Sequence, residues 1–516
     1  MEASSETGPV RGKASVPGRG DLSRRFQPMT SAVARIGTGS AYGPQRSRYD
    51  VVAVGSGFAT SFFLWALLRQ AGKPLRVLVL ERGPLVAHDW QVRNRRNSPV
   101  EEASTYHHSA DVPKTWRFNV GFGGGSNCWT GHVPRMLPSD FAMASKYGVG
   151  RDWPLGYDDL EPHYEMAEAV MDVSGPADRH PFPKRGPYPQ PPHRLSVPDR
   201  ILQQASPDRV FALPTVRARA ATPTRGQCCA NGVCGICPVD AKFTILNGMG
   251  ELYTNARVEL SCQAEAVAIE TSAGRASAVV YEQAGREFAA QADLVVLGAN
   301  GIFNPALMLR SGLSHPMLGR NLHEQGGFSA RVYLDGVDNF QGSTYETALN
   351  YALYDGPHRR SHAACLIEHK NVSRLRPEYG RWRQVLDLDF LVEDLPDPRN
   401  RVEIAPGDRK PHVVFRGYSE YHHRGVAAAK AQIARIVQAL PVERIEIDPA
   451  PRLTTAHLQG TTVMGNDPDE SVVDRTLRHH RIRNLFVLGS GVFPSGPPAH
   501  PTLTICALSL WAAAHA

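Results

Sequence analysis

Two histidines near the C-terminus have the residue type and the surroundings for acid–base chemistry. His457 precedes Leu458-Gln459-Gly460-Thr461, and His500 precedes Pro501-Thr502. The unperturbed pKa of imidazole lies near neutrality, so either ring could accept the hydroxyl proton of an alcohol while the carbon-bound hydrogen leaves as hydride. The chain contains twenty histidines, and for either residue taken alone a structural role is the competing interpretation.

A glycine-containing turn near the N-terminus is flanked by the elements of a nucleotide site. Val51–Val54 is a short apolar run that predicts a buried strand, Phe58–Gln70 predicts a helix, and Val77–Leu80 predicts a second buried strand. Together they form a β-α-β unit, which requires parallel strands and a right-handed crossover. The unit places Gly55-Ser56-Gly57 between a strand and a helix N-terminus.

This turn and the end of the second strand predict dinucleotide binding. Gly55 and Gly57 permit the tight turn and a close approach of the backbone to a pyrophosphate, whose charge the helix N-terminus favours. Glu81 is placed to accept a hydrogen bond from a ribose hydroxyl. Thr60 replaces the third glycine of the usual fingerprint, at a position that serves helix–strand packing. The expected cofactor-binding residues of this unit are Gly55, Ser56, Gly57, Phe58, Ala59, Thr60, Glu81 and Arg82.

A second glycine-rich segment, Gly123–Gly131, contains Asn127, Cys128 and Trp129. Alone it would be interpreted as a surface loop. Arg135 and Asp152-Trp153-Pro154-Leu155 follow it, and Asn300–Pro305 and Gly319–Leu322 form further turns. With the first turn and the two histidines, this pattern resembles the glucose-methanol-choline (GMC) family of FAD-dependent alcohol oxidoreductases over roughly residues 48–516.

The resemblance implies an α/β fold. An FAD-binding Rossmann-like domain, of the kind also found in glutathione reductase, would carry an inserted substrate domain built on an antiparallel sheet. The FAD-binding domain is expected at 48–155, 240–325 and 451–516, and the substrate-binding domain at 156–239 and 326–450. The implied cofactor is FAD.

The resemblance also implies further site residues. His500 is expected to be the catalytic base and His457 to orient the substrate by hydrogen bonding. A family histidine is replaced by Gln325, His323 is out of register, and neither is assigned a catalytic role. Additional FAD contacts are expected from Gly124, Gly125, Ser126, Asn127, Trp129, Thr130, Val267, Ser490, Gly491, Pro501 and Thr502.

Four of the eight cysteines lie together at Cys228, Cys229, Cys234 and Cys237. Three interpretations stay open: thiolate ligands of an iron–sulfur cluster or zinc, a disulfide, which a reducing compartment disfavours, or free thiols. The segment resembles one that holds a three-iron cluster in bacterial sugar dehydrogenases, but its last spacing is one residue shorter. Cys128, apart from these, is expected to be a packed thiol and not a covalent FAD link.

The substrate is expected to be a sugar or aminosugar. The chain resembles family members that oxidise the 6′-hydroxymethyl group of paromamine-type aminoglycosides to an aldehyde, with the carboxylate open to a second oxidation. Asp387 and Asp389 share a strand face and are candidates for binding a cationic substrate, against the alternative of a solvated strand face. Two other hypotheses are a sugar or polyol dehydrogenase that passes electrons through a cysteine-bound cluster to a cytochrome or quinone, and an inactive binding module.

Composition restricts the partners. The net charge of +7 is modest for 516 residues, and no zinc-finger or basic-helix pattern indicates a nucleic-acid partner. No apolar stretch is long enough to cross a membrane. Residues 1–47 are rich in Gly, Ser, Pro and Arg and predict a disordered tail without an export signal. A cytoplasmic enzyme is expected, with oxygen or a dye- or quinone-like compound as its electron acceptor.

Overall fold

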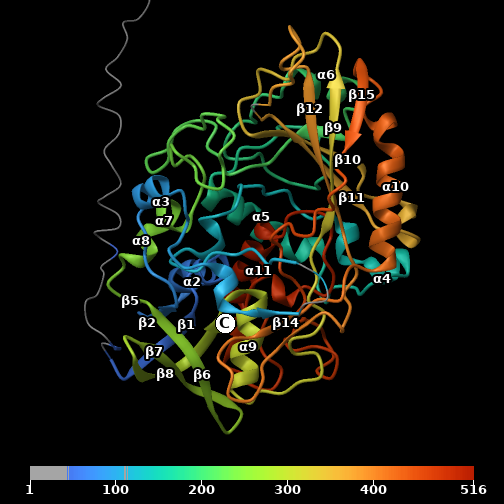
Figure 1. Ribbon diagram of the computed structural model, residues 1–516. Helices are drawn as coiled ribbons and strands as arrows, with labels where there is room; N and C mark the ends of the chain where they lie inside the picture. Colours follow the sequence, from blue (N-terminus) through green and yellow to red (C-terminus); the bar gives the residue numbers. More distant parts are fainter. Residues whose placement is uncertain (1–35, 37–42, 45, 110–111, 113, 373) are drawn as a thin grey trace, which may run out of the picture.

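The computed structural model describes residues 36, 43–44, 46–109, 112, 114–372 and 374–516. The disordered tail expected at 1–47 therefore falls almost entirely outside the described residues. Within them, no helix combines the length and apolarity needed to cross a bilayer. Two sheets, one at each end of the molecule in Figure 1, organise the chain.

The first sheet has seven strands and carries the predicted β-α-β unit. Its order is β5-β2-β1-β8-β7-β6, and β16 pairs with β8. Strands β5, β2, β1, β8 and β16 are mutually parallel, whereas β6 and β7 form an antiparallel hairpin against β8. The strands are β1 (Arg48–Val54), β2 (Val77–Glu81), β5 (Val258–Cys262), β6 (Ala264–Ser272), β7 (Arg275–Gln283), β8 (Arg286–Leu297) and β16 (Leu485–Val487).

Helices α2 (Phe58–Gln70), α5 (Tyr157–Met171) and α11 (Thr502–Ala514) lie between the two sheets (Figure 1). Helix α11 packs against α2 and α5. Most of its residues are buried, as expected for a helix that is apolar on most faces. Helix α9 (Asn300–Arg310) follows β8 and packs on β6.

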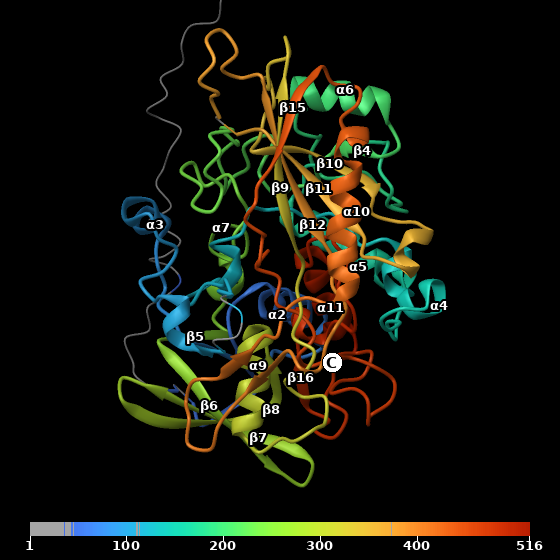
Figure 2. The ribbon, with the colours of Figure 1, turned by 45° about the vertical axis from the view of Figure 1, so that its right-hand side comes forward.

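The second sheet has six strands in the order β15-β9-β12-β11-β10-β4, and every neighbouring pair is antiparallel. The strands are β4 (Val210–Ala212), β9 (Gly326–Leu334), β10 (Glu346–Leu353), β11 (Cys365–Lys370), β12 (Val385–Val392) and β15 (Val442–Ile447). Helix α10 (Glu420–Ile436) runs along one face of this sheet (Figure 2). The first sheet, with its five parallel strands, and the antiparallel second sheet confirm the expected fold class; the domain boundaries stay a prediction.

Smaller elements complete the fold. Strands β13 (Arg401–Glu403), β14 (His412–Val414) and β3 (His107–His108) form a third sheet. The remaining helices are α3 (His88–Asn94), α4 (Met143–Tyr147), α6 (Val197–Ala205), α7 (Ile245–Gly248) and α8 (Gly250–Tyr253), with 3-10 turns η2 (Glu102–Thr105), η3 (Gly124–Ser126), η4 (Pro138–Phe141), η5 (Pro357–Arg360) and η6 (Ser490–Val492).

The sequence predicts a helix near 427–440, but helix α10 begins earlier, at Glu420, and ends at Ile436. Ser419 explains the start, because its hydroxyl accepts a hydrogen bond from the backbone N–H of His422 at 3.2 Å and caps the first turn. The local signal for this boundary was therefore a capping serine that lies outside the apolar pattern.

Candidate active site

A cavity of about 820 Å³ extends between the two sheets. At one end it is lined by the carboxyl ends of parallel strands, at Val54, Leu80 and Gly298. At the other end Glu346 and Lys370 of the antiparallel sheet close it. Ligands of open parallel sheets bind outside the carboxyl ends of the strands, so the first end has the position of a nucleotide site.

The first glycine turn requires glycine for two reasons. Gly55 has φ of +90°, and a Cβ atom there would lie 2.7 Å from the carbonyl oxygen of Gly298. The neighbouring Ser56 hydroxyl donates to Glu81 Oε2 at 2.6 Å, and the N–H of Gly83 donates to Oε1 at 2.9 Å. The carboxylate of Glu81 is thereby held on the cavity wall, where each oxygen retains capacity to accept from a ribose hydroxyl.

Thr60, which replaces the third fingerprint glycine, does not line the cavity. It is fully buried and packs against Gly298, where an added Cβ would lie 2.1 Å from the Thr60 hydroxyl oxygen. The fingerprint glycine of the helix is thus replaced by Thr60, and the space for its side chain is provided by Gly298, which follows β8. This pair keeps α2 close to the sheet with a larger side chain between them.

The second glycine loop lies against the first. The N–H of Gly123 donates to the Ser56 hydroxyl oxygen at 3.0 Å. Ser126 and Asn127 point into the protein, because Ser126 donates to the Gly123 carbonyl at 2.7 Å and Asn127 donates to the Phe122 carbonyl at 2.7 Å. They shape the loop, and its cavity-lining residues are Gly124, Gly125, Cys128, Trp129, Thr130 and Gly131.

The remaining expected FAD contacts divide in the same way. Ser490, Pro501 and Thr502 line the cavity, whereas Gly491 is buried and does not line it. On β6 the lining residues are Ala264, Glu265 and Ala266, and Val267 is not among them. Of the β-α-β unit, Gly55, Ser56, Gly57, Phe58, Ala59, Glu81 and Arg82 line the cavity. Two glycine loops, a helix N-terminus and a fixed carboxylate fit a dinucleotide.

His457 lies on the cavity wall and is held by Gln325. Its Nδ1 atom is 2.9 Å from Gln325 Oε1, while the Gln325 amide nitrogen donates to the carbonyls of Pro497 at 2.5 Å and Ala499 at 3.0 Å. Since the amide oxygen can only accept, Nδ1 of His457 carries the proton and Nε2 retains its lone pair. Gln325 therefore connects the two histidine loops and sets the tautomer of His457.

The backbone of the His457 loop is held by a buried ion pair. Glu324 Oε2 accepts from the N–H groups of His457 at 2.9 Å and Thr455 at 3.3 Å. Its other oxygen lies 2.6 Å from Lys114 Nζ, and both side chains are buried. The loop position is therefore determined by groups more than a hundred residues earlier in the chain.

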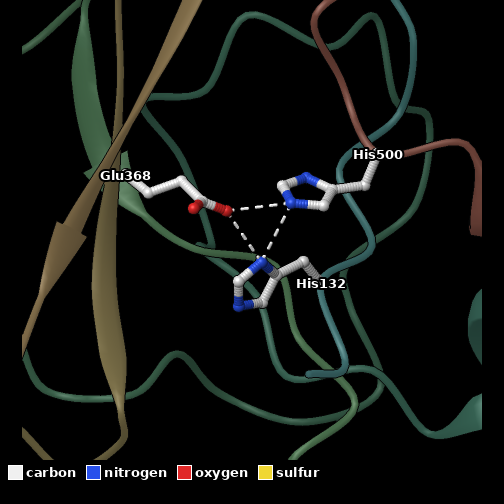
Figure 3. A group of neighbouring side chains, drawn as sticks. All are labelled: His132, Glu368 and His500. Carbon is white, nitrogen blue, oxygen red and sulfur yellow. Dashed lines mark hydrogen bonds and ion pairs between the residues drawn. The ribbon is translucent and has the colours of Figure 1, made fainter. Parts of the chain in front are cut away.

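His500 lies in a different environment, beside a carboxylate and another imidazole (Figure 3). Its Nε2 atom is 2.9 Å from Glu368 Oε1 and 3.1 Å from His132 Nδ1. His132 Nδ1 is 3.0 Å from the same Glu368 oxygen. The His500 ring is nearly perpendicular to that of His457, with centroids 5.2 Å apart. The two expected catalytic histidines are therefore brought together at one cavity wall.

A buried charged network surrounds this cluster. Lys370 Nζ contacts Glu346, lies 3.3 Å from Glu368 Oε2 and lies 2.9 Å from Asp389. Arg452 is 2.6 Å from Asp389, and Arg217 is 3.8 Å from Glu346. Three carboxylates thus face three cations, and each buried charge has a partner of opposite sign.

Burial keeps the imidazoles neutral. It holds the pKa of His457 well below the usual value, and the neighbouring His500 lowers it further. Burial also lowers the pKa of His500, although the Glu368 carboxylate opposes that shift. For Glu368, burial alone would raise the pKa, but His132 and His500 hold it well below the usual value. At neutral pH the cluster thus consists of neutral rings around an ionised carboxylate.

The structure does not bring Asp387 and Asp389 to the cavity as the sequence suggested. Asp387 forms an ion pair with Arg331 at 3.1 Å and contacts Arg374. Asp389 forms ion pairs with Lys370 and Arg452. The buried acids that line the cavity at its antiparallel-sheet end are Glu346 and Glu368. Sequence reasoning missed them, together with His132 and Lys370. For Glu368 and Lys370 the local signal is the polar run Glu368-His369-Lys370 within the strand β11, all of whose residues are buried.

His323, like Gln325, had been given no role. It is buried and its Nδ1 contacts the Asn321 carbonyl at 2.7 Å, outside the cavity lining. Gln325 proves to be the residue that orients His457. The sequence did offer one signal for this role, because Gln325 stands where the family often has a histidine.

The cysteine segment packs behind the second glycine loop. Lys242 Nζ, fully buried, donates to the carbonyls of Asn127, Trp129 and Cys234. All eight cysteines are free thiols. Among the residues that the structure describes, no three of these thiols converge to the spacing of metal ligands.

Comparison with known proteins shows the family. Models described as GMC oxidoreductase match residues 197–326 and 396–509. The fructose dehydrogenase large subunit of Gluconobacter japonicus is 30% identical over 90% of this chain and 97% of its own. Paromamine 6'-oxidase of Streptomyces fradiae is 25% identical over 90% of each chain. Pyridoxine 4-oxidase from Mesorbium loti superimposes with a TM-score of 0.63 at 18% identity, covering 90% of this chain and 99% of that one.

The chain belongs to the GMC oxidoreductase family. It is an FAD-dependent alcohol oxidoreductase. The family, fold class and enzyme class expected from the sequence are therefore confirmed.

Proposed function

We propose that the protein oxidises an alcohol carbon of a neutral sugar or polyol, with His457 as the base. When bound, FAD supplies a hydride acceptor at flavin N5. The chain's own residues hold the nucleotide through the two glycine loops, the N-terminus of α2 and Glu81. In this proposal the substrate hydroxyl lies between the second glycine loop and the two histidines, whose rings both line the cavity.

The assignment of the base rests on the tautomer that Gln325 imposes. His457 donates Nδ1–H to Gln325 Oε1, so its Nε2 lone pair is available to accept a hydroxyl proton. By contrast, His500 Nε2 already faces Glu368 and His132, and its Nδ1 is buried without a hydrogen-bond partner. This division of roles reverses the one expected from the sequence, in which His500 was the base.

Glu368 and His500 are positioning residues in this scheme. The Glu368 charge raises the pKa of His457, against the larger effect of burial. The same charge stabilises His457 once it has accepted the substrate proton, because opposite charges attract most strongly in a site that excludes water. His500 stands perpendicular to the base and fixes the side from which a hydroxyl can approach.

The observation that carries the substrate class is the charge balance of the far wall. This wall carries two cations, Lys370 and Arg452, and two carboxylates, Glu346 and Glu368, so it has no surplus negative charge for a cationic group. It instead offers many donors and acceptors, which suits a neutral compound with several hydroxyl groups. The fructose dehydrogenase subunit, at 30% identity, supports this class.

A cationic aminoglycoside is the second candidate. It is favoured by the likeness to paromamine 6'-oxidase and by two carboxylates on the cavity wall. In this case the 6′-hydroxymethyl carbon would lose hydride and become an aldehyde, whose hydrate presents the same hydrogen and hydroxyl for a second oxidation to the carboxylate.

The test is to measure flavin bleaching at 450 nm under anaerobic conditions with fructose, glucose and paromamine at equal concentrations. Neutral sugars are expected to reduce the flavin faster than paromamine. Faster reduction by paromamine would overturn the neutral-sugar proposal and support the aminoglycoside. Reduction by none of them, in a protein that retains FAD, would exclude both substrates.

A further inference from the structure

The cluster of His132, Glu368 and His500 contains three ligand-type atoms at nearly equal spacing (Figure 3). The Nδ1 atom of His132, the Oε1 atom of Glu368 and the Nε2 atom of His500 are separated by 3.0, 2.9 and 3.1 Å. All three side chains are buried and all line the main cavity. They come from three separate parts of the chain, so their convergence is a property of the tertiary structure.

This spacing is that of three ligands on one face of a metal ion. Imidazole nitrogens and carboxylate oxygens bind divalent first-row ions at roughly 2.0–2.2 Å, and ligands at right angles to one another are then about 3 Å apart. Two imidazoles and one carboxylate on a face, with the other positions open, form a known metal-binding arrangement. Among the described residues, no other group of three such side chains converges in this way.

The hydrogen bonding of the cluster is incomplete without an ion. Glu368 Oε1 is fully buried and accepts no hydrogen bond, although two ring nitrogens lie within 3.0 Å of it. His132 Nε2, on the opposite side of its ring, is also buried without a hydrogen bond and faces the carboxylate of Glu346. Buried polar groups are almost always satisfied, so both atoms call for an explanation.

An ion would occupy the lone pair of Glu368 Oε1 and fix the tautomer of His132. With the Nδ1 lone pair of His132 on the metal, the ring proton resides on Nε2 and is shared with Glu346. This is the carboxylate–histidine–metal arrangement that orients many protein ligands. The second oxygen of Glu368 is likewise supported, by Lys370 Nζ at 3.3 Å.

We propose that His132, Glu368 and His500 form a binding site for a divalent transition-metal ion that accepts octahedral coordination, such as Co²⁺; Zn²⁺ can use the same three ligands. The open coordination positions face the cavity, where water or a substrate oxygen can occupy them. A bound ion coordinates the Nε2 atom of His500 and occupies part of the cavity beside His457, where the substrate hydroxyl would bind. It is therefore expected to inhibit alcohol oxidation. That consequence rests on the proposed function; the binding itself does not.

The experiment uses the FAD-loaded full chain, freed of metals by a chelator and then desalted. After incubation with Zn²⁺ and gel filtration, metal analysis is expected to find one ion per chain. The same protocol with Co²⁺ should produce a high-spin EPR signal, which oxidised flavin does not obscure. If wild-type protein retains neither ion, the proposal is overturned.

Three variants locate the site. His132→Ala removes a ligand and should abolish retention of both ions. Glu346→Gln leaves the ligands in place and should weaken binding by roughly 10–100-fold, the usual effect of losing such a supporting group. His107→Ala is the matched control, because His107 is exposed, its ring centroid lies 4.8 Å from that of His412, and the pair could hold an ion at the surface; it should bind as wild type does.

The visible spectrum of bound FAD shows that each variant is folded. Equal retention of ions by His132→Ala and wild type would overturn the proposal, as would loss of binding in His107→Ala with full binding in His132→Ala. Zn²⁺ bound at the cluster without any inhibition would leave the metal site standing and would instead remove the proposed role of His500.

Discussion

The cavity has two walls of different composition, one at the cofactor end and one at the substrate end. The cofactor wall consists of backbone and small residues, with Gly55, Gly57 and Gly124 where two loops meet. The substrate wall consists of long buried side chains, Glu346, Glu368 and Lys370, from neighbouring antiparallel strands. One wall presents shape and peptide dipoles, and the other presents paired charges.

This difference determines how each wall fails. The cofactor wall tolerates no added atom at Gly55, where a Cβ would lie 2.7 Å from the carbonyl oxygen of Gly298. A wall of paired charges tolerates no lost charge, because the partner left behind is buried and uncompensated. Substitutions should therefore affect FAD retention and stability on one side, and charge balance and rate on the other.

Lys370→Met should have the largest effect on stability. It leaves Glu346, Glu368 and Asp389 without their common cation, and breaking a buried pair in this way costs about 3–5 kcal/mol. Urea denaturation of the FAD-loaded protein measures the loss. The exposed ion pair of Arg399 with Asp397 supplies the control, since Arg399→Met should change the free energy of unfolding far less, as is usual for pairs in contact with water. Equal effects of the two substitutions would contradict the paired-charge view of the substrate wall.

His457→Ala should slow flavin reduction by about a hundredfold or more, the scale of a lost general base, without loss of bound FAD. Stopped-flow reduction by the best sugar measures the rate. His500→Ala should slow reduction less, because its nitrogen faces Glu368 and not the substrate. A greater loss in His500→Ala than in His457→Ala would restore the assignment expected from the sequence.

Gly298→Ala should lower the free energy of unfolding by about 1–3 kcal/mol, the usual cost of overpacking. The new Cβ collides with Thr60, so Thr60→Gly in the same chain should recover most of the loss. A double-mutant cycle measured by denaturation provides the coupling energy. If the changes in unfolding free energy of the two single variants simply add in the double variant, Thr60 and Gly298 do not compensate each other and this interpretation is wrong.

The smallest expected effect is a shift in the pH profile. Since burial holds the pKa of His457 well below the usual value of about 6.5, the base stays unprotonated at that pH. The rate of flavin reduction should remain constant as pH falls through 6.5 and decline only at lower pH. Gln325→Glu places a carboxylate on Nδ1, stabilises the protonated ring and should move the decline to higher pH. A profile unchanged in Gln325→Glu would show that this residue does not control the base.

The cofactor side of the fold could be predicted because its signals are local. The apolar runs at Val51 and Val77, the glycines between them and Glu81 lie within some thirty residues, and local backbone requirements determine their arrangement. Even there, the compensation of Thr60 by Gly298 was invisible, because it depends on which strand lies next to α2.

The sequence by itself determined the β-α-β unit, the family registers of His457 and His500, and an antiparallel second sheet. Only the tertiary structure decided what those histidines touch. His132 and His500 are 368 positions apart, and Glu368 reaches them because β11 pairs with β10 in one particular register. Charge pairing in a buried site depends on distances between strands, which no local pattern of residues encodes.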